Sequence, residues 1–207
     1  MSLDDIPEIK MILLGESAVG KTSIIKRFYE DKFYESEAST YTMSYIDKIV
    51  EIDKKKYKLN IWDTIGQENY RSISKLFLND AKIVLLVYGI DDKNSFTALE
   101  YWYNLYKEEL EGQAILAIAG NKIDKYAEQE VSREEGQKFA NDKKAFFAEV
   151  SAKENGEIIN IFILDLIKAY LGKKNGSLGK EYTSFYLRDN NNTKKKGGCC
   201  SSKKENR

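Results

Sequence analysis

Short apolar runs alternate along this chain with longer segments in which apolar residues recur at helical spacing. Four runs are apolar on both faces, as in the buried strands of a parallel sheet; they span residues 9–14, 82–88, 114–119 and 145–150. Helical spacing is found over residues 21–31, 94–110, 133–143 and 156–171. This alternation of strands and helices predicts a doubly wound α/β domain.

Two further segments have a different pattern. Residues 43–53 and 56–63 alternate between apolar and polar positions, and charged residues separate them. Alternation over two neighbouring segments is typical of an antiparallel hairpin with one face turned to solvent. We therefore expect a hairpin at one edge of the sheet.

The apolar periodicity ends after Leu171. The remainder is rich in Gly, Asn and Lys, a composition that buries too little apolar surface to offset the entropy of ordering. We therefore predict one domain over residues 1–171 and a flexible tail over residues 172–207. Residues 190–207 carry a net charge of +5, and since the whole chain is neutral, the rest carries −5. An acidic body argues against nucleic-acid binding, whereas a basic tail suits a membrane surface.

The composition excludes several kinds of chemistry. The chain has no histidine, which excludes serine and cysteine triads and histidine-ligated metals. Its two cysteines, Cys199 and Cys200, are adjacent and cannot cross-link the fold, as expected of an intracellular protein. We expect no signal peptide, because the first ten residues are acidic and lack an apolar core. The longest apolar run, residues 83–88, is too short to span a bilayer.

A glycine-rich motif follows the first predicted strand. GESAVGKT, at residues 15–22, fits the P-loop pattern and lies between a strand and a helix, as that motif requires. Its backbone N–H groups and the start of the next helix form an anion site for phosphates. Lys21 would contact the β- and γ-phosphates, and the Thr22 hydroxyl would bind Mg²⁺. A P-loop alone leaves the nucleotide base open, since ATPases, kinases and GTPases all have one.

Two later motifs indicate guanine. NKID, at residues 121–124, follows a buried strand at its carboxyl end, where ligands bind in such sheets. The Asp124 carboxylate can accept from the N1–H and 2-amino groups of guanine, and adenine offers neither donor. Asn121 would support this loop, and the stem of Lys122 would cover the ring. SAK, at residues 151–153, would bring backbone N–H groups near guanine O6.

In this order and spacing, these motifs resemble those of the Ras superfamily of small GTPases, and of its Rab family in particular. The resemblance covers about residues 8–171 and includes WDTIGQE at 62–68 and NYRSIS at 69–74. It implies the P-loop small-GTPase fold, with a six-stranded, mostly parallel sheet, one antiparallel edge strand and helices on both faces. It also implies a GTP-binding, slowly GTP-hydrolysing switch with bound Mg²⁺ and GTP or GDP.

Site residues follow from the resemblance position by position. Gln67 matches the residue that orients the attacking water, and the catalytic group implied is Gln67, Lys21, Thr40 and Gly66. Mg²⁺ would be held by Thr22, by Thr40 and, through water, by Asp63, while Phe33 would pack across the guanine. The implied nucleotide site comprises Gly15, Glu16, Ser17, Ala18, Val19, Gly20, Lys21, Thr22, Ser23, Phe33, Thr40, Asp63, Gly66, Asn121, Lys122, Asp124, Ser151, Ala152 and Lys153.

The resemblance also implies partners. Tyr45, Trp62 and Phe77 match the three aromatics on which Rab effectors dock, although ordinary packing would explain them equally well. An exchange factor, a GTPase-activating protein and a GDP-dissociation inhibitor or escort protein are expected to act on a monomeric domain. Prenylation of Cys199 and Cys200 would attach the tail to the cytosolic face of endomembranes. The protein would alternate between this membrane and the cytoplasm, and it would act in vesicle and membrane trafficking. Palmitoylation or unmodified cysteines remain alternatives, as does a role in signalling.

Four positions depart from the Rab pattern. Ile65 replaces an alanine beside the γ-phosphate, Thr42 replaces a glycine, Gly89 replaces an aspartate, and LFLND replaces the YYRG pattern at 76–80. None of them removes a nucleotide ligand. Because the branched side chain of Ile65 would crowd Gln67, a scaffold of the same family that scarcely hydrolyses GTP is an alternative.

Overall fold

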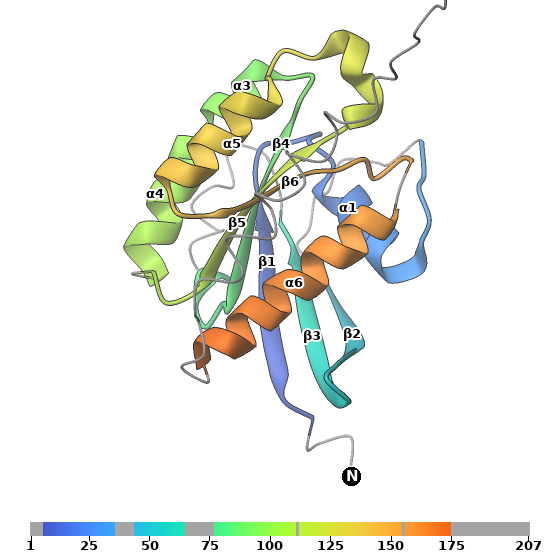
Figure 1. Cartoon of the computed structure of the whole chain (residues 1–207), viewed down its shortest axis with the longest axis vertical. Helices are drawn as coiled ribbons and strands as arrows, with labels where there is room; N and C mark the ends of the chain where they lie inside the picture. Colours follow the sequence, from blue (N-terminus) through green and yellow to red (C-terminus); the bar gives the residue numbers. More distant parts are fainter. Residues whose placement is uncertain (1–5, 36–43, 65–76, 111, 155, 175–207) are drawn as a thin grey trace, which may run out of the picture.

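A six-stranded sheet forms the centre of the molecule (Figure 1). The computed structural model describes residues 6–35, 44–64, 77–110, 112–154 and 156–174. In sheet order the strands are β2 (Ser44–Ile52), β3 (Lys55–Asp63), β1 (Glu8–Leu14), β4 (Ile83–Gly89), β5 (Ile115–Asn121) and β6 (Phe146–Glu149). All neighbours pair in parallel except β2 and β3. The predicted sheet with one antiparallel edge strand is therefore confirmed.

Helices cover both faces of this sheet. Helices α1 (Lys21–Glu30) and α6 (Gly156–Lys174) lie on one face. Helices α3 (Lys93–Thr97), α4 (Leu99–Leu110) and α5 (Arg133–Asp142) lie on the other (Figure 1). None of the helices in the described ranges is long and apolar enough to cross a membrane.

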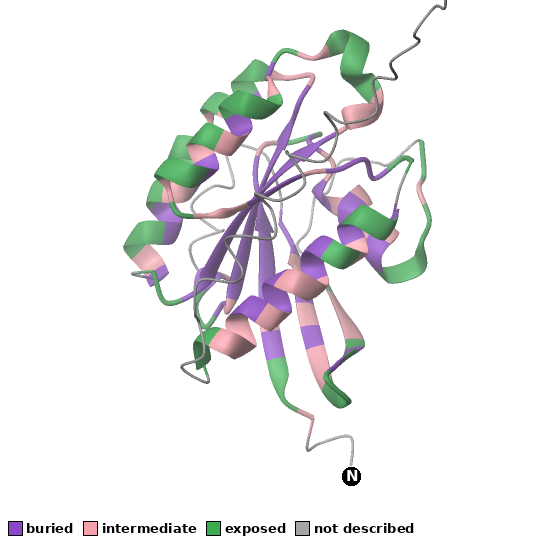
Figure 2. Cartoon of the chain, in the orientation of Figure 1, coloured by how far each residue is buried: buried purple, intermediate pink, exposed green. Residues whose placement is uncertain are grey.

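Two hydrophobic cores explain the continuous apolar runs in the sequence. Successive side chains of a strand point to opposite faces. In β1, Met11 and Leu13 enter the core beneath α1 and α6, whereas Ile12 and Leu14 enter the core beneath α4 and α5. Figure 2 shows the central strands as buried and the outer surfaces of the helices as exposed. A strand between two such cores must be apolar on both faces.

The helices differ from the sequence pattern in three places. The segment predicted as one helix over 94–110 forms two, α3 and α4, and α3 begins where the Asp92 side chain accepts from the N–H groups of Asn94 and Ser95. A short 3₁₀ helix, η3 (Ile123–Glu128), has no apolar periodicity and was not predicted. The last helix extends to Lys174, three residues beyond the expected end.

The strand order determines where a ligand can bind. β1 lies between β3 and β4; the chain leaves β1 toward α1 on one face, and it leaves β4 toward α3 and α4 on the other. Crossovers that diverge in this way leave a crevice at the carboxyl ends of the two strands. The P-loop begins directly after β1 and therefore lies in that crevice.

Candidate nucleotide site

Two glycines shape the loop between β1 and α1. Gly15 has φ +146°, and a Cβ there would lie 2.2 Å from the carbonyl oxygen of Val87 on β4. Gly20 has φ +92°, and a Cβ there would lie 2.3 Å from the side-chain nitrogen of Asn121. Both positions combine a left-handed backbone with contacts too close for any side chain, so the P-loop conformation requires glycine at each.

Lys21 brings a buried positive charge to the start of α1. Its side chain is 6% exposed, and its ammonium donates to the carbonyl oxygens of Gly15 (2.9 Å) and Glu16 (2.8 Å). Burial lowers the pKa of Lys21 to about 8. A cation held beside the N-terminus of a ten-residue helix forms an anion site, as phosphate binding requires.

The side-chain oxygens of Thr22 and Asp63 lie side by side. The Thr22 hydroxyl, in the first turn of α1, donates to the Asp63 carboxylate at the end of β3 over 2.7 Å. Mg²⁺ prefers such hard oxygen donors and commonly uses one or two protein groups together with phosphate oxygens. Because Lys21 directly precedes Thr22 in the sequence, the residues present fit a Mg²⁺ ion bound next to phosphates.

Asn121 ties together the three motifs of the predicted nucleotide site. Its side-chain nitrogen donates to the carbonyl of Val19 in the P-loop over 2.9 Å. Its side-chain oxygen accepts from the backbone N–H of Ala152 in the SAK segment over 3.2 Å. The Ser151 hydroxyl donates to the Asp124 carboxylate over 2.6 Å and so orients it. The base-recognition residues are therefore held in a defined position relative to the phosphate loop.

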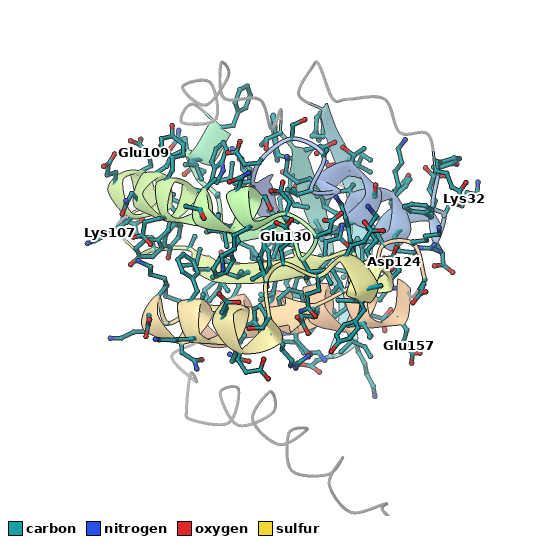
Figure 3. The ribbon with its side chains drawn as sticks, turned by 90° about the horizontal axis from the view of Figure 1, so that it is seen from above. Lys32, Lys107, Glu109, Asp124, Glu130 and Glu157 are labelled. Carbon is teal, nitrogen blue, oxygen red and sulfur yellow. The ribbon has the colours of Figure 1, made fainter. Side chains whose placement is uncertain are left out.

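These contacts surround a cavity of about 460 Å³. Figure 3 looks down on this end of the molecule and labels Asp124. The predicted residues that line the cavity are Ser17, Ala18, Gly20, Lys21, Thr22, Ser23, Phe33, Asn121, Lys122, Asp124, Ala152 and Lys153. Five others support the lining residues through hydrogen bonds: Gly15, Glu16, Val19, Asp63 and Ser151. Four lining residues were not predicted: Tyr34, Glu35, Thr64 and Lys125.

Arg27 on α1 is a supporting residue that the motifs did not reveal. Its guanidinium donates to the carbonyl oxygens of Ala152 and Lys153, each over 2.8 Å, and so holds the SAK segment from outside. Gly156 makes room for it, because a Cβ there would lie 2.8 Å from Cδ of Arg27. No local sequence signal pairs Arg27 with residues 125 and 126 positions away.

Two further hydrogen bonds connect the phosphate loop, and the strand that precedes it, to neighbouring elements. The indole of Trp102, on α4, donates to the Glu16 carboxylate over 3.1 Å. The buried Thr64 hydroxyl donates to the carbonyl of Leu13 over 2.6 Å and ties the end of β3 to β1. Trp102 lies on the helical stripe of α4, so its sequence pattern indicates only a core residue.

The three candidate effector-docking aromatics lie together. The rings of Tyr45 and Trp62 are stacked at 5.3 Å between centroids, and Trp62 and Phe77 are tilted at 5.4 Å. Tyr45 pairs with Trp62 across β2 and β3 and is 57% exposed. Trp62 and Phe77 also pack against the core beneath α4 and α5, so the cluster combines a packing role with an exposed aromatic surface.

Several predicted residues lie outside the described part of the chain. They are Thr40, Thr42, Ile65, Gly66, Gln67, Cys199 and Cys200. Their roles in hydrolysis, Mg²⁺ binding and lipidation stay predictions. The same holds for the boundary between the domain and the tail.

Comparison with known proteins identifies similar sequences. The sequence model of the Ras family matches residues 10–170. Ras-related protein Rab-12 of Mus musculus is 38% identical over 157 residues, which are 75% of this chain and 65% of that protein. Ras-related proteins Rab-17 and Rab-30 of Homo sapiens are 38% and 34% identical over 74% and 79% of this chain, and 72% and 81% of their own lengths. The chain thus spans slightly less than two thirds of Rab-12.

Proposed function

This chain belongs to the Ras family of small GTPases, within its Rab group, and on that basis we propose that it is a guanine-nucleotide switch. It binds GTP and GDP with Mg²⁺, hydrolyses GTP slowly, and regulates the traffic of intracellular membranes through GTP-dependent recruitment of effectors. The observation that carries this proposal is a pair of hydrogen bonds at Asn121, whose side chain donates to the carbonyl of Val19 and accepts from the N–H of Ala152. They join a phosphate-binding loop and a guanine-recognition loop around one cavity.

The described residues support separate roles for the two ends of this cavity, one in phosphate binding and one in base recognition. Lys21 contributes a positive charge at the phosphate end, and Asp124 contributes a carboxylate at the base end. Thr22 and Thr40 would hold Mg²⁺, and Asp63 would hold it through water. When bound, Mg²⁺ would neutralise charge on the β- and γ-phosphate oxygens. Phosphoryl transfer needs positioning and charge stabilisation rather than a covalent intermediate, which agrees with a site that contains no histidine.

Hydrolysis requires residues from the two switch segments. In our proposal the Gln67 amide orients the attacking water, and the Gly66 N–H contacts the γ-phosphate. The proposed set contains no arginine in position to stabilise the transition state, so intrinsic hydrolysis is slow and a GTPase-activating protein accelerates it. An exchange factor would replace bound GDP with GTP, and the slow hydrolysis would set how long the protein stays in its GTP-bound state.

The cellular role is proposed from the Rab relatives and from two surfaces. Tyr45, Trp62 and Phe77 form an aromatic cluster, in which Tyr45 is exposed and the other two are half-buried, and effectors would dock on it. The basic tail, prenylated at Cys199 and Cys200, would attach the protein to the cytosolic face of endomembranes, since two lipid chains anchor stably where one is marginal. A GDP-dissociation inhibitor or escort protein would return it to the cytoplasm.

Hydrogen exchange tests the switch directly. Residues 36–46 and 64–78 are expected to exchange more slowly with a non-hydrolysable GTP analogue than with GDP, because Thr40 and Gly66 contact only the γ-phosphate form. Helix α6 serves as an internal control, since none of its described residues lines the cavity. Equal protection of the two segments in both nucleotide states would contradict the proposal. Single-turnover hydrolysis on the same sample separates a slow timer from a scaffold that scarcely hydrolyses GTP.

The pKa of Lys21 predicts how GTP affinity depends on pH. In the nucleotide-free protein this pKa is about 8, and bound phosphates would raise it. Above pH 8, binding must therefore take up a proton, and affinity falls as pH rises. Between pH 7.5 and 9 we expect a loss of roughly sevenfold in a fluorescence titration. The Lys21→Met variant corrects for any titration of the nucleotide; the proton-uptake explanation fails if both proteins lose affinity equally.

A further inference from the structure

A half-buried aspartate lies beside the guanine-recognition loop. Asp91 follows β4 directly, and its side chain is only 9% exposed. Its oxygens lie 3.1 and 3.2 Å from the ammonium of Lys122 and 2.9 Å from that of Lys125. Both lysines line the cavity. One carboxylate therefore bridges two cations of the nucleotide site.

The backbone holds Asp91 in register with Lys122. The N–H of Ile90 donates to the carbonyl of Asn121 over 3.0 Å, so Asp91 and Lys122 each follow a residue of this hydrogen-bonded pair. The carbonyl of Ile90 accepts from the N–H groups of Glu130 (2.8 Å) and Val131 (3.1 Å). The backbone next to Asp91 is therefore hydrogen-bonded both to the end of β5 and to residues 130 and 131.

Asp91 carries its negative charge at neutral pH. Burial alone would raise the pKa of this carboxyl, but hydrogen bonds from Lys125 and Lys122 hold it below its ordinary value. Removing the charge would leave two neighbouring ammonium groups facing one another with no carboxylate between them.

Gly89 explains why the carboxylate stands at position 91. The Rab pattern has an aspartate at position 89, and this chain has glycine there. A Cβ at Gly89 would lie 2.6 Å from Oδ1 of Asp91 and 3.5 Å from the ammonium of Lys122. A side chain at position 89 would therefore enter the space that the Asp91 carboxylate occupies, within reach of the same lysine. The two positions are alternative sources for one carboxylate.

We propose that Asp91 is a positioning residue for guanine recognition, and that it takes over, from position 89, the anchoring of Lys122. The inference rests on the proposed function. By binding the ammonium of Lys122, Asp91 would fix this lining residue in a conformation in which its stem can cover the guanine ring. Its second contact fixes Lys125 at the rim.

The rate of GDP release from the full chain tests this role. In a chase of fluorescent GDP with excess GDP at constant Mg²⁺, Asp91→Asn is expected to release nucleotide roughly tenfold faster, the effect of losing one charge-assisted anchor. Glu128→Gln is the matched control, because Glu128 lies 3.4 Å from Lys125 on the surface and does not reach Lys122. Its release rate is expected to stay within about twofold of the parent.

Moving the carboxylate from position 91 to position 89 tests whether Asp91 positions Lys122 or only stabilises the fold. Asp91→Ala should release GDP as fast as Asp91→Asn, and Gly89→Asp combined with Asp91→Ala should restore release to within about threefold of the parent. In a Lys122→Met background, Asp91→Asn should have little further effect. If the single variants do not fold, the combined variant decides alone, since parent-like release supports the role and fast release overturns it.

The remaining outcomes separate this inference from the proposed function. If the parent binds GDP far more tightly than ADP, but Asp91→Asn releases GDP at the parent's rate, Asp91 has no positioning role and the proposed function stands. If the parent does not prefer GDP to ADP, the proposed function fails, and the inference fails with it.

Discussion

Asp124→Asn is expected to bind GTP roughly 100- to 1000-fold more weakly than the parent, because a buried polar mismatch is costly. The Ser151 hydroxyl holds the Asp124 carboxylate from one side, and it can hold the carbonyl of an asparagine in the same way. The asparagine amide would then direct its own N–H groups toward the N1–H and 2-amino donors of guanine. The N–H donors of the asparagine would face the N–H donors of guanine, and the site would no longer select guanine.

The same substitution should create a new preference. Xanthine has a carbonyl in place of the 2-amino group of guanine, and that acceptor matches the asparagine amide. Competition against a fluorescent nucleotide should therefore rank xanthosine triphosphate above GTP for Asp124→Asn, and below it for the parent. Asp142→Asn, an exposed change at the end of α5, should leave both affinities unchanged. Comparable affinity of the parent for ATP and GTP would show that Asp124 does not read the base.

Lys21→Met is expected to reduce affinity for both GTP and GDP by roughly 10²- to 10⁴-fold. The ammonium can form two charge-assisted hydrogen bonds to phosphate oxygens, each of which contributes about 1.5–3 kcal/mol. Methionine retains the length and apolar stem of lysine, so the α1 helix should still begin at residue 21. The nucleotide-free fold also loses a buried charge, whose cost is evident in the lowered pKa of Lys21.

Calorimetric titration with GDP and thermal unfolding without nucleotide separate these two effects of Lys21→Met. Binding should weaken greatly, while stability changes far less. Lys107→Met, on the exposed surface of α4, is the matched control and should bind GDP as the parent does. A Lys21→Met protein that binds GDP within tenfold of the parent would show that the phosphates lie elsewhere.

Local patterns in the sequence determined the architecture and the main chemistry. All six strands lie within two residues of their predicted ends, because apolar residues on both faces mark the strands between two hydrophobic cores, and alternation marks the edge hairpin of β2 and β3. The P-loop could also be identified from the sequence on physical grounds. Gly15 and Gly20 occupy backbone conformations and close contacts that exclude any side chain, so their spacing around the loop is itself a physical requirement.

Long-range polar contacts were decided only by the tertiary structure. The motifs could be read separately, but the hydrogen bonds that join them depend on where the strand ends meet in space. Arg27 reaches a loop 125 residues away, and Trp102 reaches the P-loop across 86 residues. Asp91 joins Lys122 because β4 and β5 are neighbours, whereas its sequence position suggests only a loop aspartate. Periodicity reports which face of an element is buried, but only the assembled sheet determines which polar groups meet at its edge.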